Sequence, residues 1–145
     1  EVDDDNAFAM GGIAGHAGLF STAADVGALG QAWLDALAGR SAWLPSEVAA
    51  RFAAPDATHG SSRALAWDTP ERAGPSTAGT RLGRGPKGAI GHLGFTGCSL
   101  WLDRDAGLAM ALLTNHVDPS GANDRPRILA LRRAFHDAVA GAVGV

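Results

Sequence analysis

The chain has 145 residues, 46% of them hydrophobic, and a formal net charge of −3 at pH 7. This length suits one domain or part of a larger one, and the apolar content is high enough to form a core and to exclude wholesale disorder. The acidic balance, without a basic stripe, argues against a nucleic-acid partner, and the apolar runs are too short for a membrane span.

The ends and the rare residues of the sequence bear on function. The chain begins EVDDDNAF without a methionine, so we expect residue 1 to be a processed or truncated boundary, and no secretory signal pattern opens it. The sequence has no tyrosine, one lysine (Lys87) and one cysteine (Cys98). A single cysteine excludes an internal disulfide.

The first third of the chain is predicted to be helical after a glycine-rich loop at residues 11–18. Thr22 and Asp25 form a pair resembling a capping box, and the acid also suits the positive end of the helix dipole. Apolar residues follow at helical spacing. Together these features predict a helix over residues 23–38.

The middle of the chain is predicted to be less regular. Pro45 suits the first turn of a second, shorter helix that ends before Pro55. Residues 56–62 are expected to form a loop and residues 64–67 a short strand. Residues 68–89 are rich in Gly, Pro, Ser and Thr without an apolar period, which predicts a long irregular connection.

The last part of the chain predicts a hairpin and a closing helix. Residues 98–103 and 108–114 would be strands joined by a turn at 104–107, the second strand buried on both faces, and residues 115–125 would form a loop. Alternation assigns two residues to each face of the first strand: Leu100 with Leu102, and Ser99 with Trp101. The C-terminal helix is expected to bury one apolar face, formed by Ile128, Leu131, Phe135, Val139 and Val143. The arginines of this helix are expected to lie mostly away from that face: Arg125, Arg127, Arg132 and Arg133.

This order of elements predicts an α+β fold in which helices pack on an antiparallel sheet. Residues 1–58 would be the end of a helical subdomain. Residues 59–145 would supply the strands and the closing helix. We expect the two parts to belong to a larger single catalytic unit.

Few residues suggest chemistry that the chain could perform alone. His92 and Cys98 could pair as imidazole and thiolate, although a lone cysteine at the start of a strand is more often a small buried apolar residue. No G-x-S-x-G elbow is present. The five histidines do not have the spacing of a zinc site: His16, His59, His92, His116 and His136. The glycines at 11, 12, 15 and 18 do not have the spacing of a dinucleotide-binding loop. No metal or cofactor is therefore expected.

Several stretches, in order, resemble the serine β-lactamase and penicillin-binding-protein superfamily, in its class C and esterase-like branch. AGHAGLFSTAADV (14–26) resembles A-G-G-L-x-S-T-x-x-D-L, and ALAWD (64–68) resembles G-L-G-W. GHLGFTGCSLWLDRDAGLAMALLTN (91–115) resembles the G-H-T-G-x-T-G-x-S strand and turn with the following V-V-L-L-T-N strand. The similarity is weakest at residues 40–62 and 69–88.

The resemblance implies a five-stranded antiparallel sheet beside a helical subdomain, with the active site between them. His92-Leu93-Gly94 matches the family's third motif, which lines one wall of the cleft. By resemblance, the backbone N–H of Phe95 would be one of two oxyanion-hole donors, and His92 would hold or polarise a substrate. Leu93, Gly94 and Thr96 would line the substrate site.

The chain lacks the other motifs of this family. S-x-x-K is impossible because Arg84 stands three residues before Lys87, and Y-x-N is impossible without tyrosine. We therefore expect half a site, inactive alone, whose partner is the missing N-terminal part of the same fold or a second copy held by exposed apolar surface. The complete enzyme would hydrolyse a small ester, amide or lactam.

Two departures within the matched part bear on the substrate. Leu93 replaces the usual hydroxyl residue, although packing alone would also explain it. The loop HVDPSGAND (116–124) lacks the cationic residue of class C enzymes. Both favour an esterase or peptidase over a β-lactamase. The alternatives are a non-catalytic binding module that keeps the fold and, third, a free-standing hydrolase built on Cys98 and His92.

Overall fold

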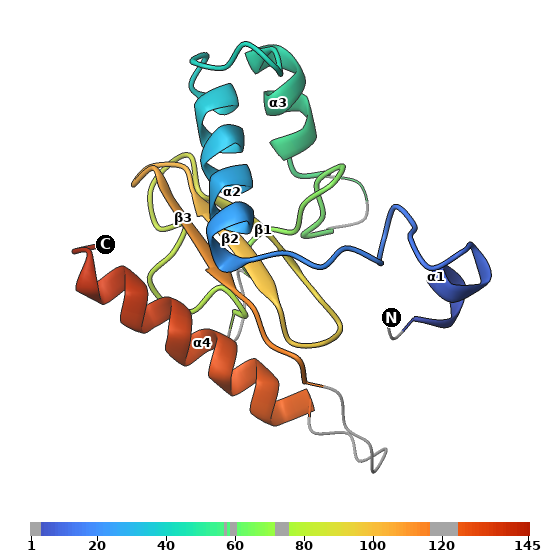
Figure 1. Cartoon of the computed structure of the whole chain (residues 1–145). Helices are drawn as coiled ribbons and strands as arrows, with labels where there is room; N and C mark the ends of the chain where they lie inside the picture. Colours follow the sequence, from blue (N-terminus) through green and yellow to red (C-terminus); the bar gives the residue numbers. More distant parts are fainter. Residues whose placement is uncertain (1–3, 57, 59–60, 72–75, 117–124) are drawn as a thin grey trace.

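The computed structural model describes residues 4–56, 58, 61–71, 76–116 and 125–145, and Figure 1 shows its elements. In chain order these are α1 (Asp5–Ala9), α2 (Ala23–Leu37), α3 (Ser46–Ala53), β1 (Ala89–Leu93), β2 (Ser99–Asp103), β3 (Leu108–Leu112) and α4 (Arg125–Ala142). The strands form an antiparallel sheet in the order β1-β2-β3, with α2 on one face and α4 on the other (Figure 1). The predicted α+β fold class is confirmed.

Helices α2 and α3 form where the sequence predicts them, whereas the short helix α1 was not predicted. The Thr22 hydroxyl accepts a hydrogen bond from the Asp25 amide at 3.2 Å, so the predicted capping pair begins α2. Helix α3 fills the interval between the two prolines. Gly30 lets α2 approach the sheet, because a Cβ at this position would lie 2.8 Å from Leu102 Cδ2 and 2.9 Å from Ala109 Cβ.

The prediction of a short strand at residues 64–67 is wrong. These residues form a tight turn in which the Ala64 N–H donates to the Trp67 carbonyl at 2.8 Å. Only Asp68 reaches the sheet, where it exchanges both backbone hydrogen bonds with Gly91 of β1. Burial of the Trp67 ring in the core bends the segment, so that it touches the sheet edge at a single residue.

The connection before β1 is irregular, as predicted, in its described parts. Neither residues 68–71 nor residues 76–88 contain a helix or a strand. Two carboxylates, one at the last residue of β2 and one just beyond it, hold the second of these stretches: Asp103 accepts from the Gly83 amide at 2.8 Å, and Asp105 accepts from the Gly88 amide at 3.0 Å. The predicted loops at 56–62 and 115–125 lie partly outside the described residues.

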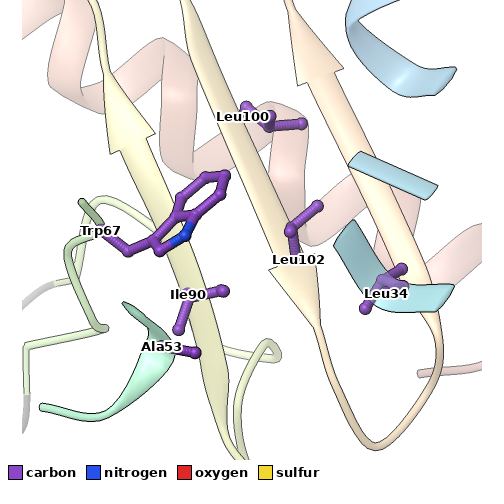
Figure 2. Packing of buried hydrophobic residues seen from close by; sticks show 6 residues of the cluster. All are labelled: Leu34, Ala53, Trp67, Ile90, Leu100 and Leu102. Atoms are coloured by element: carbon purple, nitrogen blue, oxygen red, sulfur yellow. The ribbon is translucent and has the colours of Figure 1, made fainter. Parts of the chain in front are cut away.

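The sheet separates two apolar clusters. The cluster on the α2 side contains Leu34, Ala53, Trp67, Ile90, Leu100 and Leu102 (Figure 2). The cluster on the α4 side contains Ala78, Leu82, Ala89, Trp101, Met110 and Ala140. The predicted faces of β2 are thus confirmed. The cluster on the α2 side contains residues from both predicted parts of the chain, 1–58 and 59–145, so it packs these parts together. Their assignment to separate subdomains stays a prediction.

The second strand of the hairpin is less buried than predicted. Of the residues of β3 only Met110 is buried, and its neighbours along the strand are half-buried. Strand β3 is an outer strand of the described sheet, so solvent reaches its edge, whereas all five residues of the central strand β2 are buried. No helix in the described part of the chain is long and apolar enough to cross a membrane.

Helix α4 buries only part of the apolar face that the sequence predicts: Ile128 is buried and Val139 packs against the cluster on the α4 side. The buried residues are spaced by four: Ile128, Arg132, His136 and Ala140. Leu131 and Val143, predicted to be on the buried face, are 48% and 56% exposed. Two polar side chains can replace them in the interface because carbonyl and hydroxyl groups beneath the helix bind them.

Candidate functional site

His92 and Leu93 lie at the end of β1 and point to opposite faces of the sheet. Ile90 belongs to the cluster on the α2 side, so strand alternation puts the His92 side chain on that side too. His92 is exposed, and its ring makes no hydrogen bond to a described residue. Leu93 is half-buried and packs against the cluster on the α4 side. The His92 ring is therefore open to a ligand, whereas the Leu93 side chain is used in packing.

The outer edge of β1 is open next to His92. Gly91 uses its N–H and C=O for the two bonds to Asp68, at 2.9 and 2.7 Å. In an antiparallel ladder, backbone groups two residues apart face the same edge, so those of Leu93 face outward as well. Within the described part of the chain, no segment pairs with that edge beyond Gly91.

The turn at residues 94–98 leaves the Phe95 N–H, a backbone donor, without a partner among the described residues. Gly94 donates to the Cys98 carbonyl at 2.7 Å, and Gly97 donates to the Gly94 carbonyl at 3.1 Å. Gly97 has φ +93°, a conformation that favours glycine. Phe95 is 89% exposed, and its backbone N–H donates to no described residue. The Phe95 amide thus has no role inside the described fold.

Thr96 and Cys98 face the interior of this turn. The Thr96 carbonyl accepts from the Thr114 hydroxyl at 2.6 Å and from the His116 amide at 2.9 Å. The Cys98 thiol donates to the Thr114 carbonyl at 3.2 Å and makes no hydrogen bond to His92. Cys98 therefore has a structural environment, in line with the structural alternative for this residue.

Comparison with known proteins adds the family. A profile of the Beta-lactamase family matches residues 1–133. This chain belongs to the beta-lactamase family. It is 39% identical over 133 residues to the N-acetylmuramyl-L-alanine amidase of Bacillus subtilis (strain 168), covering 88% of this chain and 29% of that protein. A beta-lactamase crystal structure from Mycobacterium bovis has the same fold, with a TM-score of 0.64 and 20% identity, covering 84% of this chain and 44% of the other.

The resemblance inferred from the motifs is thus confirmed at the level of family and fold. The chain spans less than a third of the amidase and less than half of the beta-lactamase. Its fold is of a hydrolase type, shared with proteins named as an amidase and a beta-lactamase.

Arg132 is a residue near this site that sequence reasoning placed wrongly. Sequence reasoning predicted that Arg132 would lie mostly away from the packed face. Instead, Arg132 is only 5% exposed and lies beneath the turn at residues 94–98. Its Nε donates to the Gly97 carbonyl at 3.0 Å, and its Nη2 donates to the carbonyls of Gly94 and Cys98, the latter at 3.0 Å. Burial lowers the pKa of its guanidinium, and the three carbonyls replace lost water contacts.

A buried serine–histidine pair lies one turn of α4 further on. Ser99 Oγ and His136 Nε2 are 3.0 Å apart, and His136 Nδ1 is 3.0 Å from the Thr77 carbonyl. Because a carbonyl can only accept, Nδ1 carries the proton and Nε2 accepts from the serine hydroxyl. With His136 at 0% and Ser99 at 4% exposure, no substrate reaches the pair. It joins α4 to β2 and to the loop at Thr77.

We expect this pair to make stability depend on pH. Burial lowers the pKa of His136 below its ordinary value of 6.5, outweighing the raising effect of the Thr77 carbonyl. The unfolded chain then binds a proton near pH 6.5 and the folded chain only at lower pH, so the free energy of unfolding falls as the pH drops below 6.5. Urea midpoints followed by tryptophan fluorescence at pH 7.5 and 5.5 measure the fall.

A matched pair of variants assigns this effect to the buried histidine. His136→Gln should flatten the dependence between the two pH values and lower stability at both, because it disturbs two buried hydrogen bonds. The exposed control His92→Gln should keep the dependence of the parent chain. Equal midpoints for the parent at both pH values would contradict the prediction.

Residues 4–56, 58, 61–71, 76–116 and 125–145 contain no group of three or more His, Cys, Asp or Glu side chains that could hold a metal ion. His16 Nε2 and Asp4 Oδ1, 3.0 Å apart, make an exposed contact between the glycine-rich loop and the N-cap of α1.

Proposed function

We propose that this chain forms one wall of the active site of a serine hydrolase, which transfers an acyl group to serine and then to water. The substrate would be a small ester, amide or lactam, and the amidase relative favours an amide. The nucleophile would come from another part of the same fold, because this sequence has no tyrosine and no serine three residues before Lys87. The chain would therefore be inactive alone.

The observation that carries the proposal is the Phe95 amide, which donates to no described residue and lies three residues after the exposed His92. An oxyanion hole requires a backbone N–H that the fold leaves free and that a tetrahedral intermediate can approach. Gly94, immediately before Phe95, has no side chain that would block the approach. The His92 ring would bind or polarise the substrate next to the serine.

Leu93 supports ester or amide hydrolysis over lactam hydrolysis. A leucine offers no hydroxyl to a substrate carboxylate, and this one contributes to the cluster on the α4 side. Gly94 and Thr96 would line the site through the backbone of the turn. The Thr96 carbonyl already has two donors, which leaves it little capacity to accept from a substrate.

The exposed apolar arm of the chain supports a covering partner. Figure 1 shows a long arm formed by α1 and the segment that leads to α2, with α1 standing away from the sheet. Its large apolar side chains are between 63% and 86% exposed: Phe8, Met10, Ile13, Leu19 and Phe20. Apolar surface of this extent is typical of an interface. We propose that the rest of the same fold covers it.

Hydrolysis assays on the isolated chain and on the longer protein test this proposal. The isolated chain should turn over nitrocefin and a p-nitrophenyl ester no faster than a denatured control, because it has no nucleophile in S-x-x-K. A longer protein that includes the serine should hydrolyse at least one ester, amide or lactam probe. Turnover by the isolated chain would refute the half-site, and a longer protein without turnover would favour the non-catalytic binding module.

A further inference from the structure

We infer that Arg132 is a positioning residue, which orients and polarises the Phe95 amide from behind the turn. This inference rests on the proposed function, because it gives a purpose to a donor whose catalytic role is itself proposed. It concerns a residue on α4 that is 37 positions from Phe95 in the sequence and that would not touch the substrate.

The contacts of Arg132 are concentrated on the turn. One guanidinium donates to three carbonyls of the same five-residue segment: those of Gly94, Gly97 and Cys98. The planar fork of arginine can hold several acceptors in fixed directions, which a lysine ammonium on a flexible stem cannot do. Charge-assisted bonds of this kind are stronger than those between neutral groups. The turn is thus anchored at both ends and near its tip.

The bond to Gly94 decides the direction of the donor. The Gly94 carbonyl and the Phe95 N–H belong to one peptide group, and in a trans peptide they point in opposite directions. Because Arg132 holds the carbonyl toward α4, the N–H of the same group must point away from α4, out of the turn. The Gly97 amide donates to the same carbonyl at 3.1 Å and supports this orientation.

The charge of Arg132 also acts on the strength of the donor. Hydrogen bonding to the carbonyl of a peptide group polarises that group, so its N–H becomes a better donor. The guanidinium is buried, so water does not screen its field as it would at the surface. Orientation and polarisation both favour an oxyanion in front of Phe95 over a neutral carbonyl in the same place.

The test is kinetic and uses the longer protein with the p-nitrophenyl ester. Arg132→Met should lower kcat about 10- to 100-fold, the scale expected when a catalytic group is slightly misplaced. Its KM should change little, because the interaction acts in the transition state. Arg132→Lys should fall between Met and the parent. Affinity for phenylboronic acid, whose serine adduct places an oxygen in the oxyanion hole, should fall in parallel with kcat.

Two controls separate this inference from a structural role and from the proposed function. Arg133→Met, on the same helix, removes a bond to the Ser76 carbonyl and should leave kcat and boronate affinity unchanged. Phe95→Pro removes the donor itself. If Phe95→Pro keeps full activity, the proposed function fails. If Phe95→Pro loses activity while Arg132→Met and Arg132→Lys keep the parent kcat, only the present inference fails.

A spectroscopic measurement covers the case in which Arg132→Met folds poorly. In ¹⁵N-labelled longer protein, Arg132→Lys should shift the Phe95 amide proton upfield, since a less polarised amide is a weaker donor, and Arg133→Met should not. A Phe95 signal that stays in place in Arg132→Lys would overturn the inference. So would a loss of activity that only follows a loss of thermal stability.

Discussion

Phe95→Pro is expected to lower kcat of the longer protein about 10²- to 10³-fold, the usual cost of removing one oxyanion-hole donor. Proline has no backbone N–H, and Phe95 occupies the second position of the β-turn at residues 94–97, where proline suits the common turn types. The Phe95 amide donates to no described residue, so its removal breaks no hydrogen bond of the described fold. The substitution therefore removes a donor and spares the turn.

The matched control keeps the amide and removes the ring. Phe95→Ala should retain kcat within about threefold, since the phenyl group is 89% exposed and is not the proposed oxyanion donor. Steady-state kinetics of the two variants with one p-nitrophenyl ester, alongside thermal melts, give the comparison. Equal kcat for the proline and alanine variants would remove Phe95 from the oxyanion hole.

Gly91→Ala is expected to destabilise the protein by about 1–3 kcal/mol, the usual cost of overpacking. A Cβ at this position would overlap the Trp101 ring and would lie 2.6 Å from the Leu100 carbonyl oxygen. Trp101 is fully buried against α4 and the Leu100 carbonyl is part of the backbone, so neither can move cheaply. The glycine that opens the GHLG motif is thus explained by packing. Its replacement should also displace His92.

A second glycine gives the control for this prediction. Gly27→Ala lies on α2, where an added Cβ would meet nothing within 4 Å, and it should stabilise the protein by about 0.5–1 kcal/mol. Urea denaturation followed by tryptophan fluorescence measures both variants. If Gly91→Ala were as stable as the parent, the close contact with Trp101 would not constrain this strand.

Local signals predicted α2, α3, the β2–β3 hairpin and α4, but not α1 or β1. Helix α2 follows from the Thr22–Asp25 pair and the apolar spacing, and the hairpin follows from the alternation that ends at Asp103. The segment at residues 64–67 could not be predicted in the same way. Its shape depends on burial of Trp67 among residues from α2 and β2, which are distant in the sequence. The burial of β3 likewise depends on whether other strands pair with both of its edges, which the local sequence does not show.

The candidate site was predictable only in part. The GHLG motif, by its resemblance to a known family, singled out His92 and Phe95, and the structure leaves the His92 ring and the Phe95 amide open. Which way Leu93 points depends on the register of β1 in the sheet. Arg132 carried no signal at all, because it looks like any arginine on an amphipathic helix.

The sequence by itself determined the family, the order of the main elements and the absence of the two motifs that contain tyrosine and an S-x-x-K serine. These depend on residue identities and on spacings of a few positions. Only the tertiary structure decided which polar groups are buried. The partners of Arg132 and His136 lie 34 to 59 residues away, and only packing of α4 on the sheet brings them within hydrogen-bond distance. A buried polar side chain is stable only when such partners are in place.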